Sequence, residues 1–308
     1  MRKTIVTLVA LCVALTVNAS ILRVSNVSGS TAPYSTVKAA LNAAAEGDTI
    51  MLDASPTGYS IEFQQQISKR IVLLGPGYWL QSNSIIQEGA NSAYLSGSPL
   101  TIAASGVVIC GIWFSEKLWI DNCNNVVIKR CNIRNGIEMK KNTRNCVLHQ
   151  NFIRIDDSSN NFSGSFHQFT NNIFISHWQS GYTFQNTPNS YIAYNTFLGK
   201  GGIRLWDSGD CTVEKNISGK AFYNSGSGVS SLNDNIVIEN SYNTYDNNII
   251  DSGVKALDWS TTHGAFAGDS PYVISGLPSA PVIEDMVVPT TVEYGSKMNV
   301  TIKVGVQK

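Results

Sequence analysis

The sequence predicts an all-β solenoid, in which a single chain winds into a stack of parallel coils. The prediction depends on an internal repeat with a period near 21 residues, on segments rich in Val, Ile, Phe and Tyr, and on Asn at matching places in the repeat. The chain has 308 residues, of which 43% are hydrophobic and 14% are charged. A chain of this length and composition can bury a large core, and sparse charge argues against disorder.

The repeat consists of an apolar residue, two variable residues and then, in most copies, Asn. It is found at Ile109…Ile112, Ile128…Cys131, Leu148…Asn151, Phe169…Asn172, Ile192…Asn195, Val213…Asn216 and Val237…Asn240. The first members are 19, 20, 21, 23, 21 and 24 residues apart. A period this short fits a coil of three short strands, with matching positions stacked about 4.8 Å apart. We expect the first members to fill the interior and the Asn amides to form a hydrogen-bonded ladder.

The first 19 residues have the layout of a secretory signal peptide. Arg2 and Lys3 precede an apolar run from Ile5 to Val17, and small residues before Ser20 supply a cleavage point after Ala19. The apolar run is too short to span a bilayer of about 30 Å as a helix. We therefore expect an exported chain that is not an integral membrane protein, located in the periplasm, at the cell surface or outside the cell.

A helical cap is expected before the first complete coil. Ser35 is the expected N-cap of a helix from Thr36 to Ala45, with its apolar face formed by Val37, Ala40, Leu41 and Ala44 and with Gly47 as the stop. Strands are expected at 48–52 and 71–75. A solenoid needs its first coil covered, and an amphipathic helix can provide that cover.

The C-terminal segment differs in composition. Pro278 and Pro281 predict a stiff linker, and the ranges 286–292 and 298–306 predict two strands around Tyr294, Gly295 and Ser296. We expect a hairpin that seals the last coil or forms a short attached module. The predicted organisation is a signal peptide at 1–19, a β-helix at 20–276, and a linker with a hairpin at 277–308.

Two stretches resemble a known family. The segment 35–50, STVKAALNAAAEGDTI, resembles the opening of pectate-lyase-like right-handed parallel β-helix proteins, and 126–133, VVIKRCNI, resembles their coil repeat. The resemblance covers roughly residues 20–276. It implies a single-stranded right-handed parallel β-helix with an N-terminal amphipathic helix cap, and substrates that are acidic polysaccharides, cut by lyases or by hydrolases. This architecture carries several activities, so the fold alone does not assign one.

Polar residues at matching coil positions give the candidate site. Counted from the second anchors, Asp156, His177 and Lys200 share one column, with Asp157 and Trp178 one position further on. Arg134 and Arg154 share another column, and Arg204 and Trp206 follow Lys200. We predict Asp156, Asp157, His177 and Lys200 as catalytic residues, and Arg134, Arg154, Trp178, Arg204 and Trp206 as substrate-binding residues. Three coils span about 10 Å, which suits a sugar unit.

The family resemblance extends in part to these positions. Asp156-Asp157 resembles the adjacent Asp pair of polygalacturonases, and Gly202 to Leu205 resembles their Arg-Ile-Lys element, but the Asn-Thr-Asp phrase is missing. The alternative is that the same residues form an outer sheet face in contact with solvent, with opposite charges side by side. We predict no metal or cofactor, although Glu138 with Asp156 or Asp157 could hold Ca²⁺.

Other residues are expected to be structural. After cleavage five Cys remain, at irregular spacing, and we expect small buried side chains rather than a disulfide framework or a zinc site, although one adjacent pair could be bridged. His263 lies in a segment rich in small residues, 262–268, which resembles the closing segment of such β-helices.

The functional prediction is a secreted protein that binds an acidic polysaccharide. Whether it also cleaves the polysaccharide stays open, as does the choice between lyase and hydrolase. The alternative is a non-catalytic binding or structural β-helix at the cell surface. Equal numbers of acidic and basic residues, 22 of each, argue against a nucleic-acid partner. The sequence does not assign an oligomeric state.

Overall fold

The computed structural model describes residues 19–80, 91–155, 161–176, 182–199, 203–225, 231–238, 260–277, 281–287 and 300–306. The predicted column of Asp156, Asp157, His177 and Lys200 lies outside these residues, as do Trp178, Asn240 and most of the predicted signal peptide.

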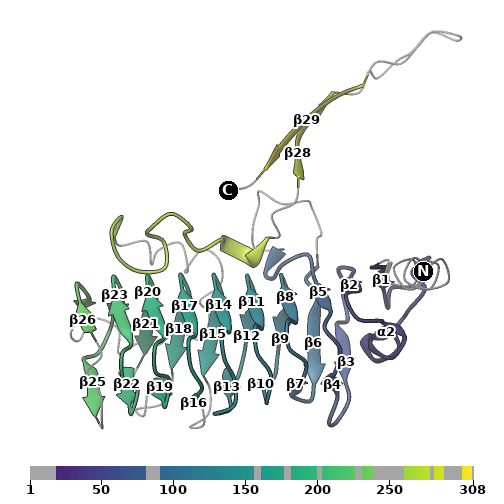
Figure 1. The fold of residues 1–308 in the computed structure, drawn as a ribbon. Helices are drawn as coiled ribbons and strands as arrows, with labels where there is room; N and C mark the ends of the chain where they lie inside the picture. The colour runs from purple at the N-terminus through teal and green to yellow at the C-terminus, as the bar shows by residue number, and fades with distance from the viewer. Residues whose placement is uncertain are drawn as a thin grey trace, which may run out of the picture.

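The described chain forms a right-handed parallel β-helix, which confirms the predicted fold class (Figure 1). Each coil contributes one strand to each of three parallel sheets, which we call sheets A, B and C in the order in which a coil visits them. Every pairing within these sheets is parallel. Neighbouring strands in a sheet therefore come from successive coils.

Sheet A consists of β1 (Ile21–Val24), β2 (Thr49–Leu52), β5 (Val72–Leu74), β8 (Val108–Cys110), β11 (Val127–Lys129), β14 (Val147–His149), β17 (Gln168–Thr170), β20 (Tyr191–Ala193), β23 (Thr212–Glu214) and β26 (Ser231–Asn233). Sheet B consists of β3 (Tyr59–Ile61), β6 (Tyr94–Gly97), β9 (Trp113–Phe114), β12 (Asn132–Ile133), β15 (Phe152–Ile155), β18 (Ile173–Ser176), β21 (Thr196–Gly199), β24 (Ile217–Ser218) and β27 (Ile236–Val237). Sheet C consists of β4 (Gln66–Ile67), β7 (Leu100–Ile102), β10 (Leu118–Ile120), β13 (Ile137–Met139), β16 (Asn161–Phe162), β19 (Tyr182–Gln185), β22 (Ile203–Trp206) and β25 (Phe222–Ser225).

The interior is a set of stacked apolar columns. The predicted first anchors from Ile109 to Val213 are register partners in sheet A, and each is fully buried. The aromatic rings stack in the same way: Phe174 lies on Phe197 with ring centres 4.7 Å apart and planes 4° from parallel. Alternation of inward and outward side chains along each strand produces this core from short strands.

The asparagine ladder is present, with one correction at its end. Asn151, Asn172, Asn195 and Asn216 are fully buried, and each donates its side-chain amide to the Oδ1 of the Asn in the next coil. The last member is Asn235 rather than Asn240, because Val213 pairs with Leu232. Leu232 and Val237 each begin the repeated pattern of an apolar residue, two variable residues and Asn. The prediction from the repeat alone chose Val237 and Asn240, which lie five residues after the observed pair.

The turn from sheet A to sheet B depends on the residue before each ladder Asn. These positions all have φ between 51° and 57°, and their residues are Gln150, Asn171, Tyr194, Lys215 and Asp234. The residue with the left-handed backbone conformation makes the turn, and the ladder Asn that follows it serves as the buried hydrogen-bonding group.

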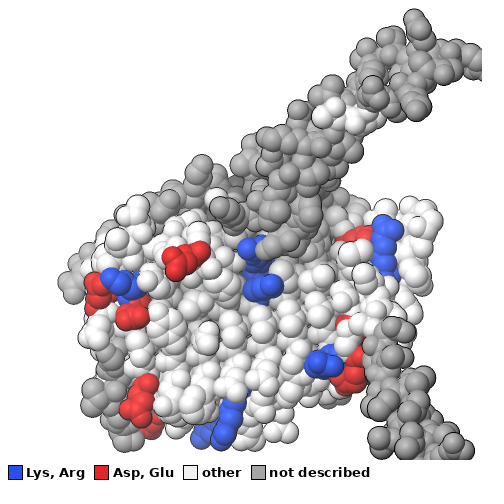
Figure 2. Space-filling model, turned by 45° about the horizontal axis from the view of Figure 1, so that its top comes forward, with Lys and Arg blue, Asp and Glu red and all other residues white. Residues whose placement is uncertain are grey.

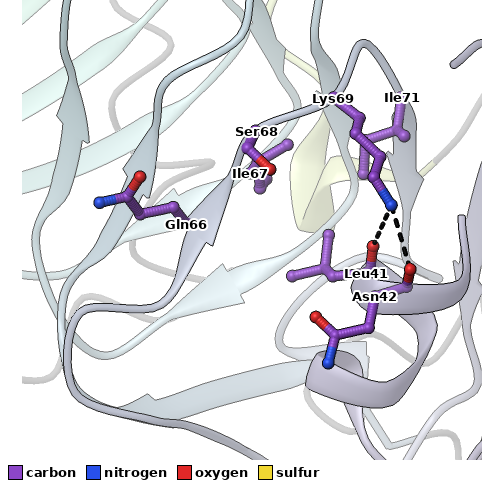
Figure 3. Close-up of a pocket in the computed structure, with 7 residues that line it drawn as sticks. All are labelled: Leu41, Asn42, Gln66, Ile67, Ser68, Lys69 and Ile71. Carbon is purple, nitrogen blue, oxygen red and sulfur yellow. Dashed lines mark hydrogen bonds between the residues drawn. The ribbon is translucent and has the colours of Figure 1, made fainter. Parts of the chain in front are cut away.

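The N-terminal cap is the predicted helix, but it is shorter. Helix α2 spans Val37–Ala43, and Thr36 rather than Ser35 is the N-cap, with its Oγ1 accepting from Ala39 N at 3.2 Å. At the other end of the helix Lys69 donates to the carbonyl oxygens of Leu41 and Asn42, as Figure 3 shows, and also to that of Ala44. A cation at the C-terminal carbonyls favours the helix. The cavity of about 160 Å³ beside it is thus part of the cap.

The segment Ser260–Leu277, which we call the strap, runs back along the coils over the outer face of sheet B. Gly264 N donates to Lys215 O, Asn171 Nδ2 donates to Ala265 O, and Gln150 Nε2 donates to Pro271 O. A second apolar cluster forms beneath the strap, from Tyr78, Phe152, Ile173, Ile175, Leu198, Ala265 and Tyr272. His263, at the start of the strap, bonds Asp234 in the last described coil.

An antiparallel hairpin is present in the C-terminal segment, with a first strand that begins earlier than predicted and a second that begins later. It pairs β28 (Pro281–Val287) with β29 (Thr301–Val306), so Pro281 starts a strand rather than belonging to the linker. Figure 1 shows the hairpin standing away from the coils instead of covering β25 and β26. Proline is tolerated as the first residue of a strand.

Candidate functional site

The outer faces of the three sheets differ, and this difference selects the candidate surface. The strap covers much of the outer face of sheet B. The outer face of sheet A carries a column of half-buried valines at 72, 108, 127 and 147. The outer face of sheet C carries exposed polar and aromatic side chains. The later coils of sheet A also carry outward polar side chains, among them Gln168, Thr170 and Glu214. Sheet C is selected because exposed aromatic rings lie beside an exposed cation on it.

The candidate surface is a row of residues across sheet C, which we call the sheet C row. By strand register the row consists of Gln66, Thr101, Trp119, Glu138, Asn161, Thr183, Arg204 and Tyr223. Successive members are about 4.8 Å apart because each comes from the next strand. A long molecule that lies along the row would therefore meet one new side chain per coil.

Exposed aromatic side chains lie in and beside this row. The exposed fractions are 38% for Trp119, 49% for Trp206 and 58% for Tyr223. Trp206 is two residues after Arg204 on β22, so both point outward, about 6.6 Å apart along the strand. Arg204 and Tyr223 are register partners. One corner of sheet C thus combines a guanidinium with two large amphipathic rings.

Charge on this surface is local rather than spread over a patch. Glu138 accepts a hydrogen bond from Lys140, so these two groups compensate each other. None of the described residues forms a hydrogen bond or an ion pair with Arg204, which leaves its donors available among the residues the structure covers. Figure 2 shows a face that is mostly uncharged, with a few acidic and basic side chains, several of which lie next to each other. Binding at sheet C would combine one cation with ring contacts.

The structure separates the sequence-predicted binding residues into two groups. Arg134 directly follows β12 and, by the pairing of Ile133 with Ile153, shares a column with Arg154 on the outer side of sheet B. Arg204 and Trp206 lie together on sheet C. The two predicted arginine positions of sheet B are thus brought together, but on a different sheet from Arg204 and Trp206.

The catalytic residues predicted from the sequence stay predictions. In chain order they fall between strands of sheet B and strands of sheet C, outside the described residues. The residues immediately before them do stack: Ile155 pairs with Ser176, and Ser176 pairs with Gly199. The coil register on which the predicted column depends is therefore continuous up to that point.

Two of the four histidines occupy structural positions. His167 is fully buried, its Nδ1 accepts from Cys146 N at 3.1 Å, and burial lowers its pKa to about 4. Burial also lowers the pKa of His149, which bonds Thr170. Burial thus favours the neutral form of both rings, and the hydrogen bonds of His167 are to groups of the surrounding coils.

The described cysteines are thiols, as expected. Cys110, Cys123, Cys131, Cys146 and Cys211 are free and buried. Burial raises the pKa of Cys123 to about 11 and that of Cys146 to about 12. A thiol with such a pKa is protonated near neutral pH and is a poor nucleophile.

Within the described residues, no group of three or more His, Cys, Asp or Glu side chains is placed to hold a metal ion. Of the acidic set considered for Ca²⁺, the structure describes Glu138, whose carboxylate is engaged by Lys140. The longest described helix, α2, has seven residues, and no described helix has the length and hydropathy of a membrane span.

Sequence reasoning missed two aromatic features. Trp119 and Tyr223 were not singled out, although their outward position follows once strand register is known. A hollow of about 380 Å³ near the first coils is lined in part by Trp79, Tyr94 and Trp113. The ring centres of Tyr94 and Trp113 are 4.7 Å apart. These rings lie in different coils, so only the register brings them together.

No family model matches the chain, and no curated protein matches it either. Among solved structures, the chain is similar to the one described as the crystal structure of pectate lyase Pel9A. The TM-score is 0.36 and the identity is 13%, over 91% of this chain and 94% of that chain. The predicted parallel β-helix fold is confirmed by the three parallel sheets of the described chain. The activity of this chain has to be argued from its own residues.

Proposed function

We propose that the protein binds an acidic polysaccharide along the outer face of sheet C. The observation that supports this is the corner of sheet C where Arg204 lies beside the exposed rings of Trp206 and Tyr223. Trp and Tyr present large, rigid surfaces that suit the face of a sugar ring, and Arg matches a carboxylate with two parallel donors. The row supplies further amide and hydroxyl groups at Gln66, Thr101 and Asn161.

The proposal places the protein outside the cytoplasm, where the predicted signal peptide would send it. It is a proposal for binding, since the one carboxylate of the sheet C row, Glu138, is held by Lys140. A glycosidase needs two carboxyl groups placed across the scissile bond. Cleavage would depend on Asp156, Asp157, His177 and Lys200, and it stays a prediction from the sequence.

Replacing Trp206 with Ala is expected to weaken binding of a polyuronide by about 10-fold or more, as for the loss of a central aromatic contact. Arg204→Gln should weaken binding of the polyuronide and leave a neutral glucan unaffected, because it removes a charge and keeps a polar side chain. Isothermal titration at low salt, where a surface charge is least screened, measures both effects.

Phe166→Ala is the matched control for Trp206, because Phe166 is 50% exposed but lies outside the sheet C row. Equal affinities of wild type, Trp206→Ala and Arg204→Gln would contradict the proposal, as would failure to bind any polyuronide. The same samples are assayed for unsaturated products and for new reducing ends, which separates binding from lyase or hydrolase activity.

A further inference from the structure

The first residue after the predicted cleavage point contacts a buried carboxylate. Ser20 N donates to Asp48 Oδ1 at 2.7 Å, and Ser20 O accepts from Thr49 N at 2.8 Å. Ser20 is thus held directly before β1, the first strand of sheet A, which pairs with β2 from Ile21 onward. The chain is fixed in the first sheet from the residue at which the mature protein is expected to begin.

Asp48 is built into the cap. It is 5% exposed, and its other oxygen, Oδ2, accepts from Ala45 N at 2.8 Å, just after helix α2. The hydrogen bond from Ser20, then that from Ala45, and then the charge of Lys69 lower the pKa of Asp48. Asp48 is therefore ionised near neutral pH, and one of its oxygens faces the nitrogen of Ser20.

We propose that cleavage between Ala19 and Ser20 converts this hydrogen bond into an ion pair that locks the mature N-terminus onto the cap. Hydrolysis of the peptide bond adds one water, leaving a carboxylate on Ala19 and an α-ammonium group on Ser20. The nitrogen that donated as an amide then donates as a cation to the same carboxylate oxygen. A charged donor at this distance forms a stronger hydrogen bond than an amide does.

In this proposal the buried Asp48 has a second function, which only the mature chain uses. In the precursor, Asp48 holds two backbone N–H groups; in the mature chain it also neutralises the new terminus. Lys69 is the other cation near Asp48, but its ammonium group donates to three carbonyl oxygens at the end of α2. The neighbouring ion pair of Glu46 with Arg70 is exposed. The inference does not depend on polysaccharide binding.

The stability gained has a defined pH range. Pairing with a carboxylate raises the pKa of the α-ammonium group above its unfolded value of about 7.7–8.0. The gain is therefore complete below about pH 7.7 and is lost as pH rises through the raised pKa. It is also lost in acid, as pH falls through the lowered pKa of Asp48. The mature chain should exceed a precursor-like chain in stability between these limits.

The test compares a chain that begins at Ser20 with one that retains Val17 to Ala19, each with Asp48 and with Asp48→Asn. We expect the chain that begins at Ser20 to melt higher at pH 6 by about 2–4 °C, the shift that corresponds to a modest interaction in a chain of this size. Asp48→Asn should abolish this difference, and so should pH 10. Asp53→Asn is the matched control, because Asp53, directly after β2, pairs with Arg23 on β1 and its loss should lower the melting temperature of both forms equally.

Mass spectrometry of the exported protein gives a second readout that needs no variant, and it should find Ser20 as the first residue. A different first residue would overturn the proposal. So would equal melting temperatures of the two chains at pH 6, or a difference that survives Asp48→Asn. None of these outcomes bears on polysaccharide binding, which is measured separately.

Discussion

Replacing Asn172 with Ala is expected to lower the free energy of unfolding by about 3–6 kcal/mol, because several buried polar groups lose partners at once. The Nδ2 of Asn172 donates to Leu148 O at 2.8 Å and to Asn195 Oδ1 at 3.0 Å, and its Oδ1 accepts from the backbone and side-chain nitrogens of Asn151. Water cannot replace these contacts, since Asn172 is fully buried. Urea unfolding followed by circular dichroism measures the loss.

The position within the ladder provides the control. Asn235 makes equivalent bonds at the last described coil but is only partly buried, so water can replace some of its partners. Asn235→Ala should therefore cost about 1 kcal/mol, the net value of an ordinary hydrogen bond. Asn142→Ala, at an exposed position outside the ladder, should change little. Equal costs at Asn172 and Asn142 would mean that the ladder does not stabilise the coils.

Replacing Phe174 with Ala is expected to destabilise the protein by about 3–5 kcal/mol, the usual cost of removing a buried aromatic side chain. Phe174 is fully buried and lies face to face with Phe197, and its ring also meets the edge of Phe162 at 6.0 Å. Part of this cost comes from the cavity that the ring leaves. The surrounding strands cannot move to fill it, because each is short and is paired with a strand on both sides. Thermal and urea unfolding of the purified variant measure it.

Phe174→Leu keeps most of the volume and should recover more than half of the loss. In the double variant with Phe197→Ala, the two costs should not add, because each ring is the other's main partner. Additive costs would show that the two rings pack independently and would contradict the stacked interior.

The repeated interior could be predicted from the sequence because it depends on one period. Each coil from Ile109 onward places an apolar residue at the same position of sheet A, and from Leu148 onward Asn follows three residues later, so the spacing alone identified Ile109 to Val213 and Asn151 to Asn216. The same rule failed at the end, where Leu232 and Val237 both fit the phrase and only strand pairing distinguishes them.

Features that join distant coils could not be predicted in this way. The strap follows no period, and its contacts with Gln150 and Asn171 join residues about 100 positions apart in the chain. The row on sheet C depends on the register of eight short strands separated by loops of unequal length, so Trp119 and Tyr223 gave no signal. Arg204 and Trp206 were identified, but their separation from Arg134 and Arg154 required knowledge of which sheet each strand joins.

The most direct test of the central proposal is a crystal structure of the protein with a bound oligouronide. The proposal predicts sugar rings against Trp206 and Tyr223, with a sugar carboxylate accepting hydrogen bonds from Arg204. An oligouronide bound to sheet A, beside the strap on sheet B, or in the hollow near Trp79 and Trp113 would contradict it.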